Sequence, residues 1–195
     1  MSLRPDLAAI ADAVPPGARV LDIGCGDGAL LAHLRDTKGV DARGIDVSAA
    51  NVASAVARGL SVVQGDADAD LADYPDDAFD MAILSDTLQA MRSPSKVLDE
   101  LVRIARRAVV SFPNFGHWRV RGSLAFGGRM PVTKSLPVSW HETPNIHLCT
   151  IDDFRALAAE NGLKIESATF LSGGARRGPA LANLLAERAV FVLAR

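Results

Sequence analysis

A glycine-rich turn near the N-terminus constrains the fold of this chain more than any other feature; it lies in the segment VLDIGCGDG at 20–28. The apolar run at 19–23 predicts a buried strand, and leucines at helical spacing in 28–37 predict a helix directly after the glycines. Glycines between a strand and a helix N-terminus let a ligand approach the backbone and meet unpaired N–H groups. The segment therefore predicts a nucleotide-type ligand at the end of the first strand.

Strands and helices alternate along most of the chain. A short helix is expected at 7–14, and further strands are expected at 40–45, 60–64, 79–84 and 108–112, with helices at 48–58 and 94–104. Short connections between alternating elements predict a parallel sheet with helices on both faces. A helix at 151–161 and strands near 163–171 and 189–194 complete the pattern, and these last two strands are expected to form an antiparallel edge pair.

The regular pattern lapses from 113 to 149, a stretch with four prolines and four glycines. Connections of this length usually serve as lids or binding segments, so we expect a lid insertion at about 113–149 within a single domain of residues 1–195. Apolar residues make up 49% of the chain and charged residues 23%, which is typical of a globular protein. The apolar runs are too short to span a membrane, and Asp6 interrupts any signal-like start, so a cytoplasmic location is expected.

Basic residues dominate the second half of the chain, and 101–141 contains no acidic residue. Such a block can attract an anionic substrate, an acidic protein or nucleic acid, although a solvated surface is the simpler interpretation. Aromatic residues interleave with the bases, as in single-strand binders. The pI of about 6.1 and the absence of an appended RNA module do not favour nucleic acid.

The glycine turn alone does not identify the nucleotide. Gly24, Gly26 and Ala29 also satisfy the dinucleotide pattern G-x-G-x-x-G/A, and Asp46 suits a ribose ligand in either class. Tight packing alone could also require these glycines. Two acidic residues favour a different ligand: Asp22 before the turn suits the ammonium of a methionine moiety, and Asp66 after the third strand suits an adenine amino group.

Three acids at one sheet edge resemble the motifs of the class I S-adenosylmethionine-dependent methyltransferases. The resemblance implies a Rossmann-like α/β fold with a seven-stranded, mostly parallel sheet in the order 3-2-1-4-5-7-6, an antiparallel edge strand and helices on both faces. It implies that the second acid binds the ribose, the third binds the adenine and the glycines hold the methionine end. The cofactor, S-adenosyl-L-methionine or S-adenosyl-L-homocysteine, would contact Asp22, Gly24, Cys25, Gly26, Gly28, Asp46, Val47, Asp66, Ala67 and Ser85.

The lid carries more specific strings: SFPNFGHWR at 111–119, GRMPV at 128–132 and TPNIHLCT at 143–150. These strings resemble the MetW family of methionine biosynthesis, and the resemblance runs from about Arg4 to the C-terminus. It implies a partnership with the homoserine O-acyltransferase MetX. The residues expected to face a substrate or a partner from the lid are Asn114, His117, Trp118, Arg119, Arg129 and His147.

Methyl transfer depends on positioning the nucleophile in line, and an oxygen or carbon nucleophile usually also needs a general base. The catalytic residues are not identified by the sequence; the candidates are His117, Asp86 and His141, and a structural role is the alternative for each histidine. His141 and His147 lie six residues apart with Pro144 between them, which does not fit a metalloprotease motif, so no metal site is expected.

Two hypotheses from different classes therefore remain. One is a protein that binds the cofactor and acts as a partner or sensor for the acyltransferase through a basic, aromatic lid. The other is an active methyltransferase on a small, anionic acceptor, with Arg119, Arg121 or Arg129 attracting the anion.

Overall fold

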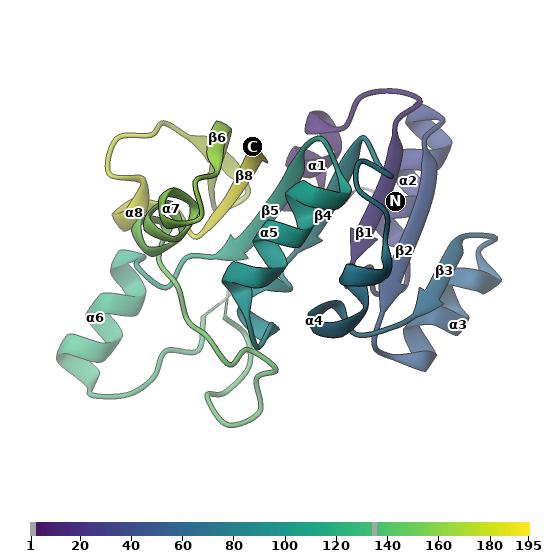
Figure 1. Cartoon of the computed structure of the whole chain (residues 1–195). Helices are drawn as coiled ribbons and strands as arrows, with labels where there is room; N and C mark the ends of the chain where they lie inside the picture. Colours follow the sequence, from purple (N-terminus) through teal and green to yellow (C-terminus); the bar gives the residue numbers. More distant parts are fainter. Residues whose placement is uncertain (1–2, 134–135) are drawn as a thin grey trace.

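The computed structural model describes residues 3–133 and 136–195, and these residues form one eight-stranded sheet in the order β3-β2-β1-β4-β5-β8-β6-β7 (Figure 1). The strands are β1 Arg19–Ile23, β2 Asp41–Asp46, β3 Ser61–Gln64, β4 Met81–Ser85, β5 Ala108–Pro113, β6 Lys164–Ser172, β7 Ala175–Arg177 and β8 Arg188–Ala194. The α-helices are α1 Pro5–Ala13, α2 Ala29–Lys38, α3 Ala49–Ala57, α4 Ala67–Asp70, α5 Pro94–Ile104, α6 Trp118–Gly127, α7 Ile151–Glu160 and α8 Ala182–Leu185, with short 3₁₀ turns at Leu71–Asp73 and Leu88–Ala90.

The sheet confirms the predicted α/β fold with mostly parallel strands. β1 to β5 pair in parallel, whereas β8 pairs antiparallel with both β5 and β6. The predicted count was one strand too low, because β7 adds a short strand at the edge; without β7, the other seven strands follow the predicted order. All three residues of β7 are exposed and two are arginines, so no hydrophobic alternation marked it in the sequence.

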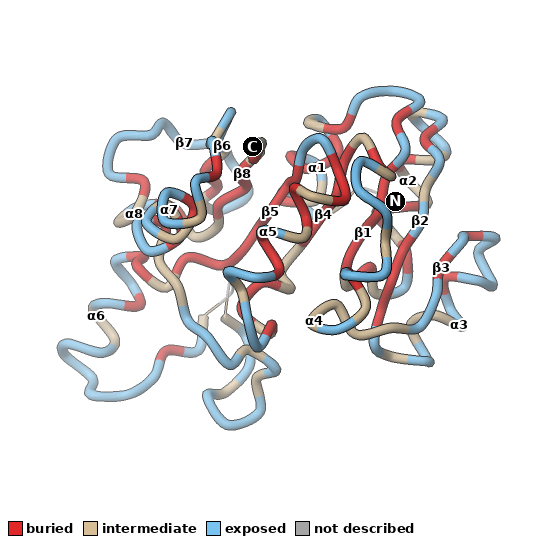
Figure 2. Tube along the Cα trace, viewed as in Figure 1, coloured by how far each residue is buried: buried red, intermediate tan, exposed pale blue. Residues whose placement is uncertain are grey.

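Alternate residues of the central strands point into two apolar layers. In β1, Val20 packs in the layer that contains Leu31 and Leu34 of α2, while Leu21 packs in the layer that contains Leu98 of α5. α1, α2 and α3 cover one face, and α5 and α7 cover the other. Figure 2 shows the buried residues concentrated along β1, β4 and β5 between these layers.

The stretch after β5 is more ordered than the sequence indicated, because it contains α6. His117 begins this helix by accepting a hydrogen bond from the Arg119 N–H at Nδ1, at 3.4 Å, and Gly128 ends it with a φ of 60°. Only Val120 of α6 is buried, and the helix projects away from the sheet (Figure 1). Its glycine and arginine residues interrupt the regular spacing of apolar residues by which a helix is recognised in a sequence. Residues 134–135 of the expected lid lie outside the described residues.

Among the described residues, none of the helices combines the length and the apolar character needed to cross a membrane.

Candidate functional site

The glycine turn joins the end of β1 to the start of α2. Gly26 and Gly28 have φ values of 57° and 76°, in the left-handed region that glycine favours. A Cβ atom on Gly28 would lie 2.3 Å from Cδ1 of Leu60, so this glycine is needed for packing. A Cβ atom on Gly26 would meet no atom within 4 Å, so the backbone there is open to a ligand.

Asp46, at the end of β2, holds the turn in place. Its Oδ2 accepts a hydrogen bond from the Gly26 N–H at 2.8 Å. Its Oδ1 accepts from the Ser48 N–H at 2.9 Å and from Nδ2 of Asn51 at 3.1 Å. The carboxylate therefore connects the glycine turn to the start of α3. Asp46, which the sequence predicts to bind the ribose, thus also has a structural role within the protein.

Asp22 lies one residue before the end of β1 and is 2% exposed. Its Oδ1 has no hydrogen-bond partner among the described residues. Burial, and to a smaller extent the negative charge of Asp46, raises the pKa of the Asp22 carboxyl to about 8. Native proteins rarely leave a buried polar atom without a partner, so this oxygen indicates a missing donor.

Asp66 begins α4 after β3, and its Oδ1 accepts from the Asp68 N–H at 3.0 Å. Asp68 was not predicted as a site residue. Its carboxylate accepts from the N–H groups of Arg92 and Ser93, at 2.9 and 3.1 Å, and so joins α4 to the loop after β4. This contact closes the far side of a cleft along the carboxyl edge of the sheet.

The cleft has a volume of about 350 Å³. Five predicted cofactor residues line it, and they come from the ends of three neighbouring strands: Gly24, Asp46, Val47, Asp66 and Ala67. Five others do not line it: Asp22, Cys25, Gly26, Gly28 and Ser85. Cys25 is buried, and burial raises the pKa of its thiol to about 12, so it is an unreactive packing residue.

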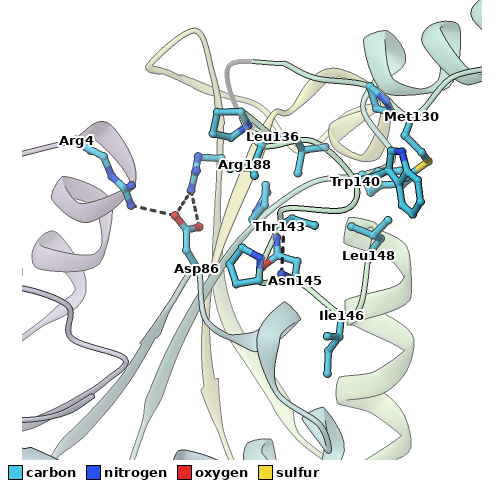
Figure 3. A pocket seen from close by; sticks show the side chains of 16 residues that line it. Arg4, Asp86, Met130, Leu136, Trp140, Thr143, Asn145, Ile146, Leu148 and Arg188 are labelled. Atoms are coloured by element: carbon cyan, nitrogen blue, oxygen red, sulfur yellow. Dashed lines mark hydrogen bonds and ion pairs between the residues drawn. The ribbon is translucent and has the colours of Figure 1, made fainter. Parts of the chain in front are cut away.

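A second, larger pocket of about 590 Å³ lies under the lid, and we call it the lid pocket (Figure 3). Three residues line both the cleft and the lid pocket, so the two spaces adjoin: Asp86, Pro144 and Asn145. Most of the apolar side chains that line the lid pocket come from the segment after α6 and include Met130, Leu136, Val138, Trp140, Ile146 and Leu148.

Asp86 stands between the two spaces with a φ of 56°, which is uncommon outside glycine. Arg188 Nη1 donates to both of its carboxylate oxygens, at 2.5 and 2.7 Å, and Arg4 Nη2 donates to Oδ2 at 3.0 Å. Figure 3 shows both guanidinium groups pointing toward Asp86. Asp6 joins the same network through Oδ2, at 2.9 Å from Arg4 and 3.1 Å from Arg188. Asp86 could act as a general base only if this network opened.

The sheet topology explains how Arg188 reaches the site. Because β8 runs antiparallel to β5, its first residue, Arg188, lies opposite Pro113 at the end of β5. Arg4 lies near the other end of the chain, directly before α1. Neither residue was predicted, since no local pattern marks a contact between residues so far apart in sequence.

The three histidines of the lid do not line the cleft or the lid pocket in the described part of the chain. His117 is 4% exposed, and burial lowers its pKa. His141 is exposed, with Nδ1 at 3.4 Å from the Ser139 hydroxyl. His147 lines a separate pocket of about 210 Å³ beside Cys149, whose thiol pKa is raised to about 11 by burial.

The remaining predicted lid residues also lie outside the lid pocket. Asn114 is buried, whereas Trp118 and Arg119 are exposed on α6, where the Arg119 guanidinium lies 5.3 Å from the Trp118 ring centroid. Arg129 is exposed just beyond the helix. The bases expected to attract an anion therefore lie outside the pocket, and Arg4 and Arg188 line it instead.

Gln89, a buried residue after β4, attaches the lid to the sheet. Its backbone oxygen accepts from the N–H groups of Ile146 and His147, both at 2.9 Å. Its Nε2 donates to the Pro113 oxygen at 3.2 Å. This anchor places the 144–148 segment over the junction between the cleft and the lid pocket.

A sheet of this order, with its cleft at the carboxyl edge beside the glycine turn, defines the class I S-adenosylmethionine-dependent methyltransferase fold. A solved S-adenosylmethionine-dependent methyltransferase of Mesorhizobium loti has this fold, with a TM-score of 0.72, 17% identity and coverage of 98% of each chain. Within this class the chain belongs to the MetW family, described as methionine biosynthesis protein MetW, which matches residues 4–193.

Two further proteins are similar to this chain. The magnesium protoporphyrin IX methyltransferase of Synechocystis PCC 6803, solved with bound S-adenosylhomocysteine, matches 97% of this chain and 80% of its own, with a TM-score of 0.63 and 21% identity. The bifunctional methionine biosynthesis protein MetXA/MetW of Rhodopirellula baltica is 35% identical over 179 residues. The match covers 87% of this chain and 29% of that relative, so the chain spans less than a third of its length.

Proposed function

We propose that this protein binds S-adenosyl-L-methionine or S-adenosyl-L-homocysteine in the cleft and acts with the homoserine O-acyltransferase MetX in methionine biosynthesis. The observation that carries the partnership is the Rhodopirellula relative, whose name joins MetXA and MetW in one chain. Two functions that are fused in one protein often correspond to two proteins that associate in another organism.

The residues at the sheet edge fit the cofactor. The unpartnered Oδ1 of Asp22 supplies a buried acceptor that the ammonium of the methionine moiety could satisfy directly or through water. Asp46 would accept from the ribose hydroxyls, and Asp66 with Ala67 would contact the adenine, since all three line the cleft. When bound, S-adenosyl-L-methionine supplies an activated methyl group.

The surface of α6 supports the protein partnership. We define the α6 surface by the exposed residues Trp118, Arg119, Leu124 and Phe126, of which Phe126 is 94% exposed. Exposed aromatic and apolar side chains beside a base are typical of protein interfaces, in which aromatic residues and arginine are enriched. The helix projects from the sheet, so its outer side is accessible to a partner (Figure 1).

The test is co-purification of the full chain with the homoserine O-acyltransferase of the same organism. We expect Phe126→Ala and Trp118→Ala each to weaken the complex at least tenfold while leaving the fold intact, because both side chains are exposed. Val63→Ala on β3 is the matched control, since it removes an exposed apolar side chain at the other end of the sheet. An acyltransferase that neither binds this protein nor changes in activity with it would overturn the partnership.

The adjoining pockets favour one second function: methyl transfer to a small anionic acceptor in the lid pocket. An acceptor there would lie beside the cofactor cleft, because Asp86, Pro144 and Asn145 line both spaces. The check is release of S-adenosylhomocysteine from S-adenosylmethionine with a panel of small carboxylic acids, with and without the acyltransferase. No release above the rate without acid would exclude this activity for those acids.

A further inference from the structure

Four charged side chains meet beside the cofactor cleft, and their charges balance. Nη1 of Arg188 donates to the carboxylates of Asp6 and Asp86, and Nη2 of Arg4 donates to the same two groups. Asp6 is 3% exposed, so this acid depends on the two guanidinium groups for compensation of its charge. Two positive and two negative charges are complete without a ligand. The network therefore acts by holding one of its own members in place.

The member that needs holding is Asp86. Its φ of 56° lies in the left-handed region, which is strained for a residue other than glycine. The carboxylate receives hydrogen bonds from Arg188 at 2.5 and 2.7 Å and from Arg4 at 3.0 Å, and Figure 3 shows both guanidinium groups converging on it. Charged hydrogen bonds of this kind are strong, so they stabilise the strained conformation of Asp86.

The conformation of Asp86 determines where Thr87 lies. Thr87 Oγ1 donates to the backbone oxygen of Ser85 at 2.8 Å, across Asp86. A Cβ atom on Gly24 would lie 2.5 Å from Oγ1 and 2.8 Å from Cγ2 of Thr87, so the Thr87 side chain lies directly against the glycine turn. Gly24, Asp86 and Thr87 all line the cleft. A change in the backbone at Asp86 would therefore move Thr87 and alter the wall of the cleft.

In the described part of the chain, Arg4 and Arg188 do not line the cleft, whereas Asp86 does. We propose that both arginines are positioning residues of the cofactor cleft: they hold Asp86, and Asp86 holds Thr87 against Gly24. Residues near the two ends of the chain thus set the shape of the cleft, because Arg4 precedes α1 and Arg188 begins β8. The inference rests on the proposed function for the identity of the ligand, but the effect on the loop after β4 requires no ligand.

The first test is hydrogen–deuterium exchange of the full chain without ligand, measured by NMR. The N–H groups of Asp86 and Ala90 donate to backbone oxygens at 3.0 and 2.9 Å. We expect both to exchange at least about threefold faster in Arg4→Gln, because loss of an ion pair makes local opening easier. Arg176→Gln is the matched control, since this exposed arginine pairs with Asp12 of α1. Unchanged exchange in Arg4→Gln would overturn the inference, whether or not the cofactor binds.

The second test is the affinity for S-adenosylhomocysteine, determined by calorimetric titration. Arg4→Gln should raise the Kd at least about threefold, although this side chain is 56% exposed and does not line the cleft. Arg4→Lys should restore the Kd to within about twofold, because Arg4 pairs through a single nitrogen atom, which a lysine can replace. A Kd of Arg4→Gln equal to that of the unchanged protein would overturn the inference.

A double variant shows whether Arg4 acts through Asp86. In a chain that carries Asp86→Ala, Arg4→Gln should change the Kd less than about 1.5-fold, because the contact that transmits its effect is already lost. The same loss of affinity with and without Asp86→Ala would overturn the inference.

Arg188→Gln should raise the Kd more than Arg4→Gln does, because Arg188 donates to both carboxylate oxygens of Asp86. If this variant does not fold, the Arg4 variants still decide. If the unchanged protein does not bind S-adenosylhomocysteine, the proposed function fails, and the exchange measurement alone decides whether the arginines position the loop after β4.

Discussion

The Gly26 N–H donates to Oδ2 of Asp46 at 2.8 Å, so the last residue of β2 fixes the turn that follows β1. The second oxygen of Asp46 is bonded to the start of α3. The carboxylate therefore holds the glycine turn in shape before any ligand arrives, and a ribose hydroxyl would add to contacts that already exist. Preorganisation of this kind reduces the entropy cost of binding.

Removal of this carboxylate should therefore weaken cofactor binding. We expect Asp46→Ala to raise the Kd for S-adenosylhomocysteine at least tenfold in calorimetric titration, since about 1.4 kcal/mol corresponds to a tenfold change and a charged hydrogen bond contributes at least that much. Asp41→Ala, at the exposed start of the same strand, is the matched control, because Arg43 is the only described side chain with which this residue forms an ion pair. A Kd within twofold of the unchanged protein would show that Asp46 does not contact the ligand.

The buried carboxyl of Asp22 should make stability depend on pH. Burial raises its pKa from 3.8 to about 8 in the folded chain. Between these values the folded chain binds more protons than the unfolded chain, so the free energy of unfolding falls as pH rises, by at most about 1.4 kcal/mol per pH unit. Below the lower value and above the higher value this contribution no longer changes.

Asp22→Asn should remove that slope, because the amide does not titrate. The measurement is urea denaturation at several pH values from about 5 to 8, and the variant should gain stability relative to the unchanged chain as pH rises. Asp12→Asn, an exposed residue of α1, should leave the slope unchanged. Parallel pH profiles for Asp22→Asn and the unchanged protein would mean that the Asp22 carboxyl ionises normally in the fold.

Substitutions of two glycines in the turn, Gly26 and Gly28, should distinguish a residue needed for packing from one needed for ligand binding. Gly28→Ala places a Cβ 2.3 Å from Leu60 and 3.1 Å from Cβ of Ala55, so we expect a loss of about 3 kcal/mol from overpacking and backbone strain. Gly26→Ala adds a Cβ to open space at a positive φ and should cost about 1 kcal/mol.

The second measurement is the affinity of the Gly26→Ala and Gly28→Ala variants for S-adenosylhomocysteine, determined by titration. Gly26→Ala should weaken binding more than Gly28→Ala does, because the added methyl group would enter open space in the turn whose first glycine, Gly24, lines the cleft. Equal stability losses in urea denaturation would contradict the packing argument for Gly28.

The sheet and its acidic edge were predictable because they depend on local patterns. The bounds of β1 match the prediction at both ends, and parallel strands bring Asp46 and Asp66 to one edge whatever the details of the helices. The lid pocket was not predictable in this way. Its charged wall forms where Arg4 and Arg188, near opposite ends of the chain, meet Asp86. Only the antiparallel return of β8 creates that contact.

The burial of individual lid residues was not predictable from the composition of the lid. The sequence predicted that Asn114 and His117 face a ligand or partner, but both are buried. Nδ2 of Asn114 donates to the backbone oxygens of Asn183 and Ala186, at 3.0 and 2.8 Å. Its Oδ1 accepts from the Gly116 and Ile151 N–H groups, at 2.9 and 3.2 Å. One side chain thus joins β5, α7 and α8.

Asn114→Ala should therefore act on stability. Four backbone groups lose a partner in or near the core, and unsatisfied buried groups are costly, so we expect a loss of about 3 kcal/mol in the free energy of unfolding, measured by urea denaturation. Asn145→Ala is the matched control: its side chain makes one long hydrogen bond to the described residues, from Nδ2 to Oε1 of Gln89 at 3.4 Å, and its loss should cost less than about 1 kcal/mol. If the two variants lost equal stability, or if Asn114→Ala weakened partner binding without lowering stability, Asn114 would belong to the interface and not to the core.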